Sequence, residues 1–125
     1  MTRLRRRAEF VAVAAAGRRF VTSAFVLQLG RRPDATPGEI GLGFTASRRI
    51  GKAVARNRAR RRLREAARML LPGPARPGYN YVIVARPAVL TWPFARLSSE
   101  LRTAFARLAP GREALRAAAA DSSPS

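Results

Sequence analysis

The sequence predicts an α+β domain in which a small sheet packs against helices. Three observations support this fold class. The chain has 125 residues, the size of one ordinary domain. Its hydrophobic content of 47% is sufficient for one modest core. Helix-like and strand-like patterns follow one another in the order α, β, β, α, β, α, with Pro- and Gly-containing loops between them.

The first part of the chain is predicted to contain one helix and one β-rich run. Residues 1–8 are strongly basic, and a helix is expected over residues 8–16, with Gly17 at its end. Residues 20–29 are rich in the β-branched and aromatic side chains that are typical of strands. A further short strand around residues 18–23 also fits the pattern.

A second strand is predicted over residues 40–46, after a loop marked by Pro33 and the Pro37-Gly38 pair. Large and small side chains alternate along this strand. One face carries Ile40, Leu42, Phe44 and Ala46, and the other carries Gly41, Gly43, Thr45 and Ser47. A face of small residues allows a helix, another backbone or a ligand to approach closely.

The second half is predicted to form helix, strand and helix. Residues 51–71 carry one apolar stripe, and residues 79–85 are apolar at nearly every position, which indicates a central, buried strand. The last helix is expected over residues 94–108. The stripe consists of Ala55, Ala59, Leu63, Ala66 and Leu70. We expect residues 1–111 to form the domain and the Ala- and Ser-rich residues 112–125 to be a frayed or disordered tail.

The composition excludes several classes of protein. The formal net charge is +18, from 25 Lys and Arg against 7 Asp and Glu, so a polyanionic partner is expected. The sequence has no Cys and no His, which excludes disulfides, thiolate nucleophiles and the commonest zinc ligands. No apolar run approaches the roughly 18–20 residues of a membrane span. We therefore expect a cytoplasmic protein without a membrane partner.

The densest feature is a basic helix. Ten basic residues lie between Arg48 and Arg68, with Glu65 as the only acid among them. Arg56, Arg60 and Arg64 repeat at four-residue steps, so they repel one another on one helical face. Bound phosphates would relieve this repulsion, whereas the alternative is a solvated basic face. Asn57 lies within the run as either an RNA contact or an ordinary exposed residue.

The same segment resembles the signature of the protein subunit of bacterial ribonuclease P. The matching sequence runs from Gly51 to Glu65 and reads GKAVARNRARRRLRE, a basic "RNR" helix preceded by Gly-x-Ala-Val and followed by Arg-Glu. Flanking features agree in order: the aromatic Phe10 in the first helix, the turn Gly17-Arg18, and apolar strands on both sides of the basic helix. The resemblance covers roughly residues 3–109.

This resemblance implies a fold and a function. The fold is an αβββαβα sandwich similar to a ribosomal-protein domain, with a left-handed βαβ crossover that general chirality rules would not predict. The implied function is that of a subunit of a ribonucleoprotein endonuclease, which removes the 5′ leader from precursor tRNA. The implied partners are a catalytic RNA and precursor tRNA, and protein oligomerisation is not required. Mg²⁺ is expected to be held mainly by the RNA, with no cofactor and no catalytic side chain in this chain.

The resemblance also assigns site residues. The RNA-binding set is Arg48, Arg49, Lys52, Arg56, Asn57, Arg58, Arg60, Arg61, Arg64 and Arg68. The cleft for the single-stranded leader is expected to be lined by Phe10, by Phe25 and Leu27 or the residues that alternate with them, and by Ser47. Phe10 is either a stacking platform for a leader base or a core residue. Ala14 stands where many family members have a second aromatic, and an aromatic near Gln28 is also missing, so leader stacking is expected to be weaker here.

Three alternatives remain open from the residues alone. A ribosomal or other structural RNA-binding protein would have the same charge without a substrate cleft. A nonspecific DNA-binding protein would bind duplex DNA and structured RNA equally well. A protein-only nuclease would need carboxylates brought together by folding. The acids are scattered in sequence at Glu9, Asp34, Glu39, Glu65, Glu100, Glu113 and Asp121, which does not favour such a site.

Overall fold

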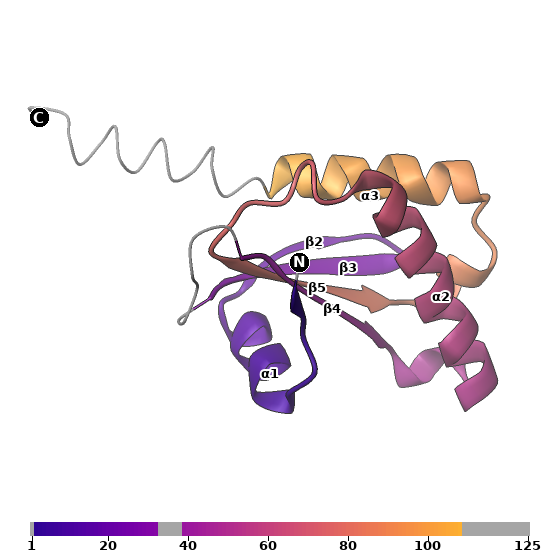
Figure 1. Ribbon diagram of the computed structural model, residues 1–125. Coiled ribbons are helices and arrows are strands. Elements are labelled where there is room, and N and C mark those ends of the chain that lie inside the picture. The colour runs from indigo at the N-terminus through magenta and orange to yellow at the C-terminus, as the bar shows by residue number, and fades with distance from the viewer. Residues whose placement is uncertain (1, 33–38, 109–125) are drawn as a thin grey trace, which may run out of the picture.

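The computed structural model describes residues 2–32 and 39–108, and these form one mixed sheet with helices on both faces (Figure 1). The elements in chain order are β1 (Thr2–Arg3), α1 (Arg7–Ala15), β2 (Arg18–Val21), β3 (Phe25–Arg31), β4 (Gly41–Ala46), α2 (Ala53–Leu70), β5 (Tyr79–Ala85) and α3 (Phe94–Arg107). Short 3₁₀ turns at Arg48–Ile50 and Pro87–Leu90 precede α2 and α3. The predicted α+β class is confirmed.

From α1 onward the order is the expected αβββαβα, including the short strand before β3. The additional strand β1 was not predicted, because two residues are too few to show a periodicity. The predicted loop at Pro33 and Pro37-Gly38 and the predicted tail at residues 112–125 lie outside the described residues.

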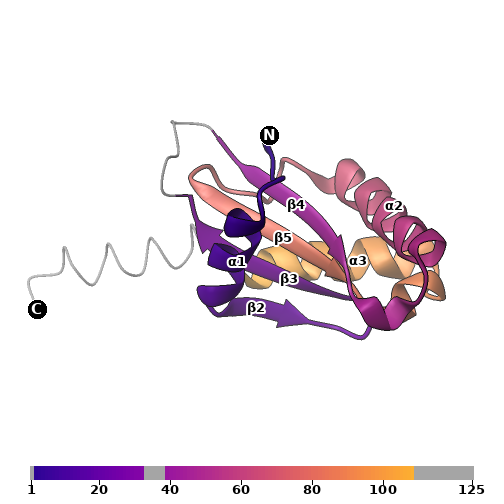
Figure 2. The ribbon, with the colours of Figure 1, turned by 90° about the horizontal axis from the view of Figure 1, so that it is seen from below.

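The five strands lie in the order β1-β4-β5-β3-β2, so β5 is central, as its apolar sequence predicted. β4 and β5 are parallel neighbours, whereas β3 pairs antiparallel with both β5 and β2. In Figure 2, seen from the α1 side, β4 and β5 run in the same direction and α2 joins them by way of the far face. This crossover is left-handed, an exception to a strong general rule.

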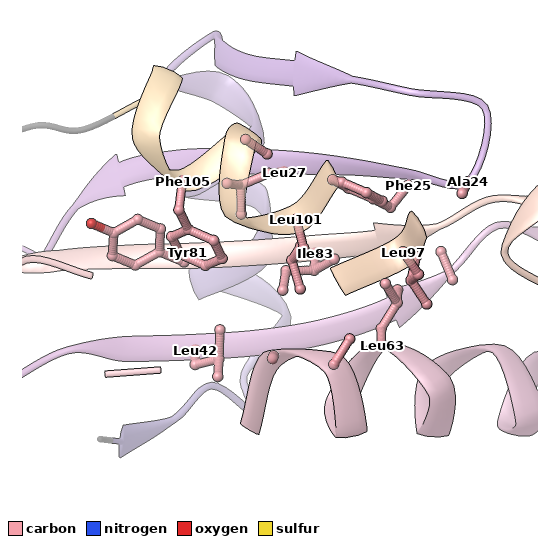
Figure 3. Close-up of a cluster of buried hydrophobic side chains, with 14 of the residues drawn as sticks. Ala24, Phe25, Leu27, Leu42, Leu63, Tyr81, Ile83, Leu97, Leu101 and Phe105 are labelled. Atoms are coloured by element: carbon pink, nitrogen blue, oxygen red, sulfur yellow. The ribbon is translucent and has the colours of Figure 1, made fainter. Parts of the chain in front are cut away.

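The main core lies between the sheet and the pair α2 and α3 (Figure 3). Strand β3 contributes Phe25 and Leu27, and β5 contributes Tyr81 and Ile83. The helices contribute Leu63 from α2 and Leu97, Leu101 and Phe105 from α3, all of which are at most 1% exposed. Leu63 belongs to the apolar stripe predicted for α2, and the buried α3 residues recur at four-residue steps, so burial of one face accounts for the placement of both helices.

A smaller cluster lies on the other face, under α1. It consists of Leu4, Val13 and Val82, with Phe10 and Val84 packed at its margin. Glycines bring α1 close to the sheet. A Cβ added at Gly43 would lie 2.7 Å from the Phe10 ring, and one at Gly30 would lie 3.1 Å from the Val13 Cα atom. The predicted small-residue face of β4 is thus confirmed as the seat of a helix.

Candidate nucleic-acid interface

A groove of about 460 Å³ runs between α1 and the sheet. Its lining is mainly apolar and comprises Arg7, Phe10, Val11, Ala14, Gln28, Phe44, Thr45 and Val82. The Phe10 ring packs over Gly43 and remains half-exposed to the groove. Phe10 therefore combines the two locations that the sequence left open, core and cleft, because its ring borders the small cluster and also lines the groove. An accessible aromatic ring beside an arginine is a suitable surface for a nucleotide base.

The prediction that Phe25 and Leu27 line this groove is wrong. Both side chains are 0% exposed and lie in the main core on the opposite face of the sheet. The α1 side of β3 is formed instead by the alternate residues, among which Gln28 lines the groove. The two faces of a strand alternate with each residue, so an offset of one position moves a side chain to the other face.

Ser47, the fourth predicted cleft residue, does not line the groove either. It follows β4, and its Oγ atom accepts a hydrogen bond from the Arg49 N–H at 3.2 Å. Ser47 therefore caps the 3₁₀ turn at Arg48–Ile50, which leads the chain from β4 into α2. Arg48, Arg49 and Lys52 are all exposed in this connection, at the N-terminal end of the basic helix.

The outer side of α2 forms a second depression, of about 410 Å³. The structure brings together at this site five of the predicted RNA-binding residues: Asn57, Arg58, Arg60, Arg61 and Arg64 line it with Val54. The side chain of Val54 is exposed and adds an apolar contact that the sequence did not indicate. Among the described residues the recorded salt bridge joins Arg32 to Glu39, away from α2, so the guanidinium groups of this depression lack carboxylate partners. Such a surface is electrostatically prepared for phosphates.

Asn57 has a defined local role on this face. Its Oδ1 atom accepts a hydrogen bond from the guanidinium of Arg60, one turn further along α2. This bond holds the Arg60 head group against the helix and orients its remaining donors outward. Of the other predicted residues on α2, Arg56 is half-buried and Arg68 is exposed, and neither lines the depression.

Arg62 differs from the other arginines of α2, because its guanidinium hydrogen-bonds to backbone carbonyls outside the helix. Its guanidinium donates hydrogen bonds to the backbone carbonyl of Trp92 at 2.7 Å and, at 3.4 Å, to that of Leu90. The Trp92 ring is buried and is covered by the guanidinium of Arg96, 3.9 Å from the ring centroid. Arg62 thus ties α2 to the connection that precedes α3. The basic helix has one arginine that fixes its position and several that face outward.

Phe44 is the site residue that sequence reasoning missed. The sequence placed Phe44 on the core face of β4, and its ring does pack against the main core. It also lines the groove beneath α1. Strand β1 pairs with the edge of β4 only as far as Leu42, so β1 does not pair with the edge of β4 beside Phe44. The Arg64 guanidinium lies over the Phe44 ring, 6.0 Å from its centroid. Phe44 therefore belongs to the groove and also touches the basic face of α2.

Two features are absent from the described part of the chain. No helix within residues 2–32 and 39–108 is long and apolar enough to cross a membrane. The same residues contain no group of three or more His, Cys, Asp or Glu side chains that could hold a metal ion.

Comparisons with known proteins agree on one family. A family model described as Ribonuclease P matches residues 1–109. A ribonuclease P protein component from Ruegeria pomeroyi is 47% identical over 107 residues, which span 84% of each chain. One from Caulobacter vibrioides is 46% identical and is covered over 70% of its length, against 86% of this chain.

Solved structures show the same fold. The RNase P protein of Staphylococcus aureus matches with a TM-score of 0.69 at 19% identity, over 87% of this chain and 98% of that one. The RNase P protein from Thermotoga maritima matches with a TM-score of 0.64 at 25% identity, over 81% of this chain and 92% of that one. With the sequence matches, these findings establish that the chain belongs to the family of ribonuclease P protein components.

Proposed function

We propose that this protein binds the catalytic RNA of ribonuclease P through the outer face of α2 and binds the 5′ leader of precursor tRNA in the groove beneath α1. Family membership supports a role as the protein subunit of a ribonuclease complex. The observation that carries the finer proposal is the juxtaposition of two unlike surfaces. One is a guanidinium-lined depression with no carboxylate among its described lining residues, and the other is a mainly apolar groove with an accessible aromatic ring.

The two surfaces suit two states of RNA. A folded RNA presents dense phosphates to a partner, and fork-shaped guanidinium groups bind them in a fixed geometry. A single strand presents unpaired bases, and these stack on an aromatic ring with a free energy of about 1–3 kcal/mol per base. Phe10 offers such a ring beside Arg7, which can contact the adjacent backbone. We therefore place structured RNA at α2 and the leader in the groove.

Bond breaking is assigned to the RNA in this proposal. Hydrolysis by a protein metal site needs clustered carboxylate or imidazole ligands, and the described residues provide no such cluster. The protein side chains instead neutralise phosphate charge and position the substrate, which lets two RNA molecules approach. The Mg²⁺ ions of the reaction are held mainly by RNA phosphates. The reaction takes place in the cytoplasm, where precursor tRNA is made.

Reconstitution with the RNA subunit from the same organism tests the proposal. Leader removal is measured at limiting Mg²⁺ with wild-type protein and with Arg58→Ala and Arg61→Ala, whose side chains line the depression on α2. Each substitution is expected to weaken RNA-subunit binding about tenfold, as for loss of one charged hydrogen bond. Each should also reduce the steepness of the salt dependence, by about 0.7–0.9 on a log–log scale per phosphate contact.

Arg102→Ala is the matched control, because Arg102 is exposed on α3 and lines neither the depression on α2 nor the groove beneath α1. It removes the same charge and should leave both quantities nearly unchanged. Equal effects of all three substitutions would show that only net charge matters. If wild-type protein did not stimulate cleavage at limiting Mg²⁺, or if the protein cleaved precursor tRNA without the RNA, the proposed division of roles would be wrong.

A further inference from the structure

A third cavity, of about 200 Å³, lies on the α2 side of β4 near the N-terminus. It is lined by Thr2, Arg3, Leu42, Phe44 and Arg64, which come from β1, β4 and α2. Arg3 belongs to the basic N-terminal segment, and unlike Arg7 of that segment it lines neither the groove nor the depression on α2. The cavity therefore joins one arginine of the RNR helix to one arginine far from it in sequence.

The floor of this cavity is apolar and its walls are cationic. Phe44 and Leu42 belong to the sheet, and the Arg64 guanidinium lies 6.0 Å above the Phe44 ring centroid. Arg3 is exposed at the rim. Burial, followed by the charges of Arg3 and Arg60, lowers the pKa of Arg64 below its ordinary value. The described lining residues include no Asp or Glu, so among them these guanidinium groups repel one another without a compensating anion.

The edge of β4 is open beside this cavity. Strand β1 pairs with β4 at Gly41 and Leu42, and the last hydrogen bond between the segments runs from the Leu4 N–H to the Leu42 carbonyl. Beyond that point the chain turns away into α1. Phe44, two residues further, lines both this cavity and the groove under α1. A strand lying in the groove can therefore pass around the open edge of β4 and reach Arg3 and Arg64.

We propose that Arg3 and Arg64 together bind one backbone phosphate of the RNA strand that occupies the groove under α1, at the point where this strand crosses the open edge of β4. The phosphate bridges two guanidinium groups that otherwise repel, and the Phe44 ring holds the Arg64 head group in place. The assignment rests on the proposed function and extends it. It adds Arg3, a residue outside the basic helix, and predicts a path for the strand. It also assigns Arg64, which lines the depression on α2 as well, to the substrate strand and not to the catalytic RNA.

A double-mutant cycle in the assembled holoenzyme tests the shared phosphate. Affinity is measured for a precursor tRNA with a leader and for mature tRNA without one, using Arg3→Ala, Arg64→Ala and the double variant. For the precursor, each single substitution is expected to weaken binding about tenfold. The double variant should bind little worse than either single variant, because the first substitution already breaks the phosphate contact that both arginines share. For mature tRNA the coupling should vanish.

Arg5→Ala and Arg58→Ala form the control cycle. Both side chains are exposed, they come from the same two regions of the chain, and they share no cavity. Their effects on precursor affinity should multiply. Because all four arginines are solvent-exposed, the variants are expected to fold, and thermal unfolding of each free protein checks this. Multiplying effects for Arg3 and Arg64 as well would overturn the shared phosphate.

The source of the phosphate is identified with precursors that carry one uncharged methylphosphonate at successive leader positions. With wild-type protein, one position should weaken binding about tenfold, and with the double variant that position should have no effect. Coupling that appears only in binding of the catalytic RNA alone would assign the phosphate to that RNA and overturn the path along the groove. Failure here, with wild-type protein still stimulating cleavage, leaves the proposed function intact.

Discussion

The two faces of the sheet differ in how completely they are covered. On one face α2 and α3 bury large side chains such as Phe25, Leu101 and Phe105. On the other face a helix of nine residues covers a cluster with only three fully buried members, and a groove remains open beside it. Buried apolar area is the main source of folding free energy. Stability is thus concentrated on one face, which leaves the other free to bind.

The largest effect on stability is expected for Leu101→Ala. Leu101 is 0% exposed in the main core, and its truncation is expected to reduce the free energy of unfolding by about 2–5 kcal/mol, because a cavity remains. Val11→Ala on α1 is the counterpart, since Val11 is 56% exposed at the groove, and it should cost less than about 0.5 kcal/mol. Urea unfolding of both variants measures the difference. Equal losses would show that the two faces contribute alike.

Phe10→Ala tests whether the open face binds the leader. Loss of the ring from the groove should weaken precursor tRNA binding by about 1–3 kcal/mol, the value of one stacked base, and leave mature tRNA binding nearly unchanged. Affinities of the holoenzyme for the two tRNAs provide the test. An equal loss for precursor and mature tRNA would indicate that Phe10 serves only to pack α1 onto Gly43.

Arg62 separates the structural arginines from those that bind. Arg62→Met retains the apolar stem but leaves the carbonyls of Leu90 and Trp92 without this donor, so unfolding free energy should fall by about 1–3 kcal/mol. RNA affinity is then measured as a function of salt concentration. Its log–log slope should stay at the wild-type value, whereas Arg58→Ala lowers it. A reduced slope for Arg62→Met would mean that this guanidinium also contacts phosphate.

The smallest effect is expected at Tyr81, in the core. Its hydroxyl oxygen accepts the Arg76 N–H at 2.9 Å, and burial raises its pKa, an effect that this hydrogen bond partly offsets. An acid with a raised pKa binds its proton more tightly in the folded state. Its stabilising contribution is therefore complete below the ordinary tyrosine pKa of about 10 and is lost as the pH rises through the folded value.

Tyr81→Phe should cost about 0.5–1.5 kcal/mol at neutral pH, through the lost hydrogen bond. Above about pH 10 the wild-type protein should lose stability faster than the variant. Thermal unfolding across this pH range makes the comparison. Parallel curves would show that the ionisation of Tyr81 does not differ between the folded and unfolded states.

Much of the fold could be predicted from local patterns. The helical stripe through Leu63 and the apolar run at residues 79–85 each depend on near neighbours in sequence, and both were confirmed. Strand β1 could not be predicted, because it exists only through its pairing with β4. The left-handed crossover came from the family resemblance, since general chirality favours the opposite hand.

The candidate site was predictable to a lesser extent. The motif brought together five residues on one face of α2, because helical spacing fixes their relation. On β3 the choice between Leu27 and its alternate Gln28 required knowing which face the larger core covers, and naming Leu27 put the wrong face first. Phe44 was missed because its access to the groove depends on where a different strand ends. Whether any of these arginines binds RNA stays a prediction.

The clamp from Arg62 to the carbonyls of Trp92 and Leu90 has a practical consequence. The half-buried Arg62 guanidinium hydrogen-bonds to neutral carbonyl groups, and salt screens this contact little. The outward arginines are exposed to solvent, where salt ions screen their charges. Concentrated electrolyte should therefore dissociate RNA from the protein while α2 stays packed in its native position. After the salt is removed, the protein should still be folded and able to bind RNA again, so dissociation and rebinding need no refolding.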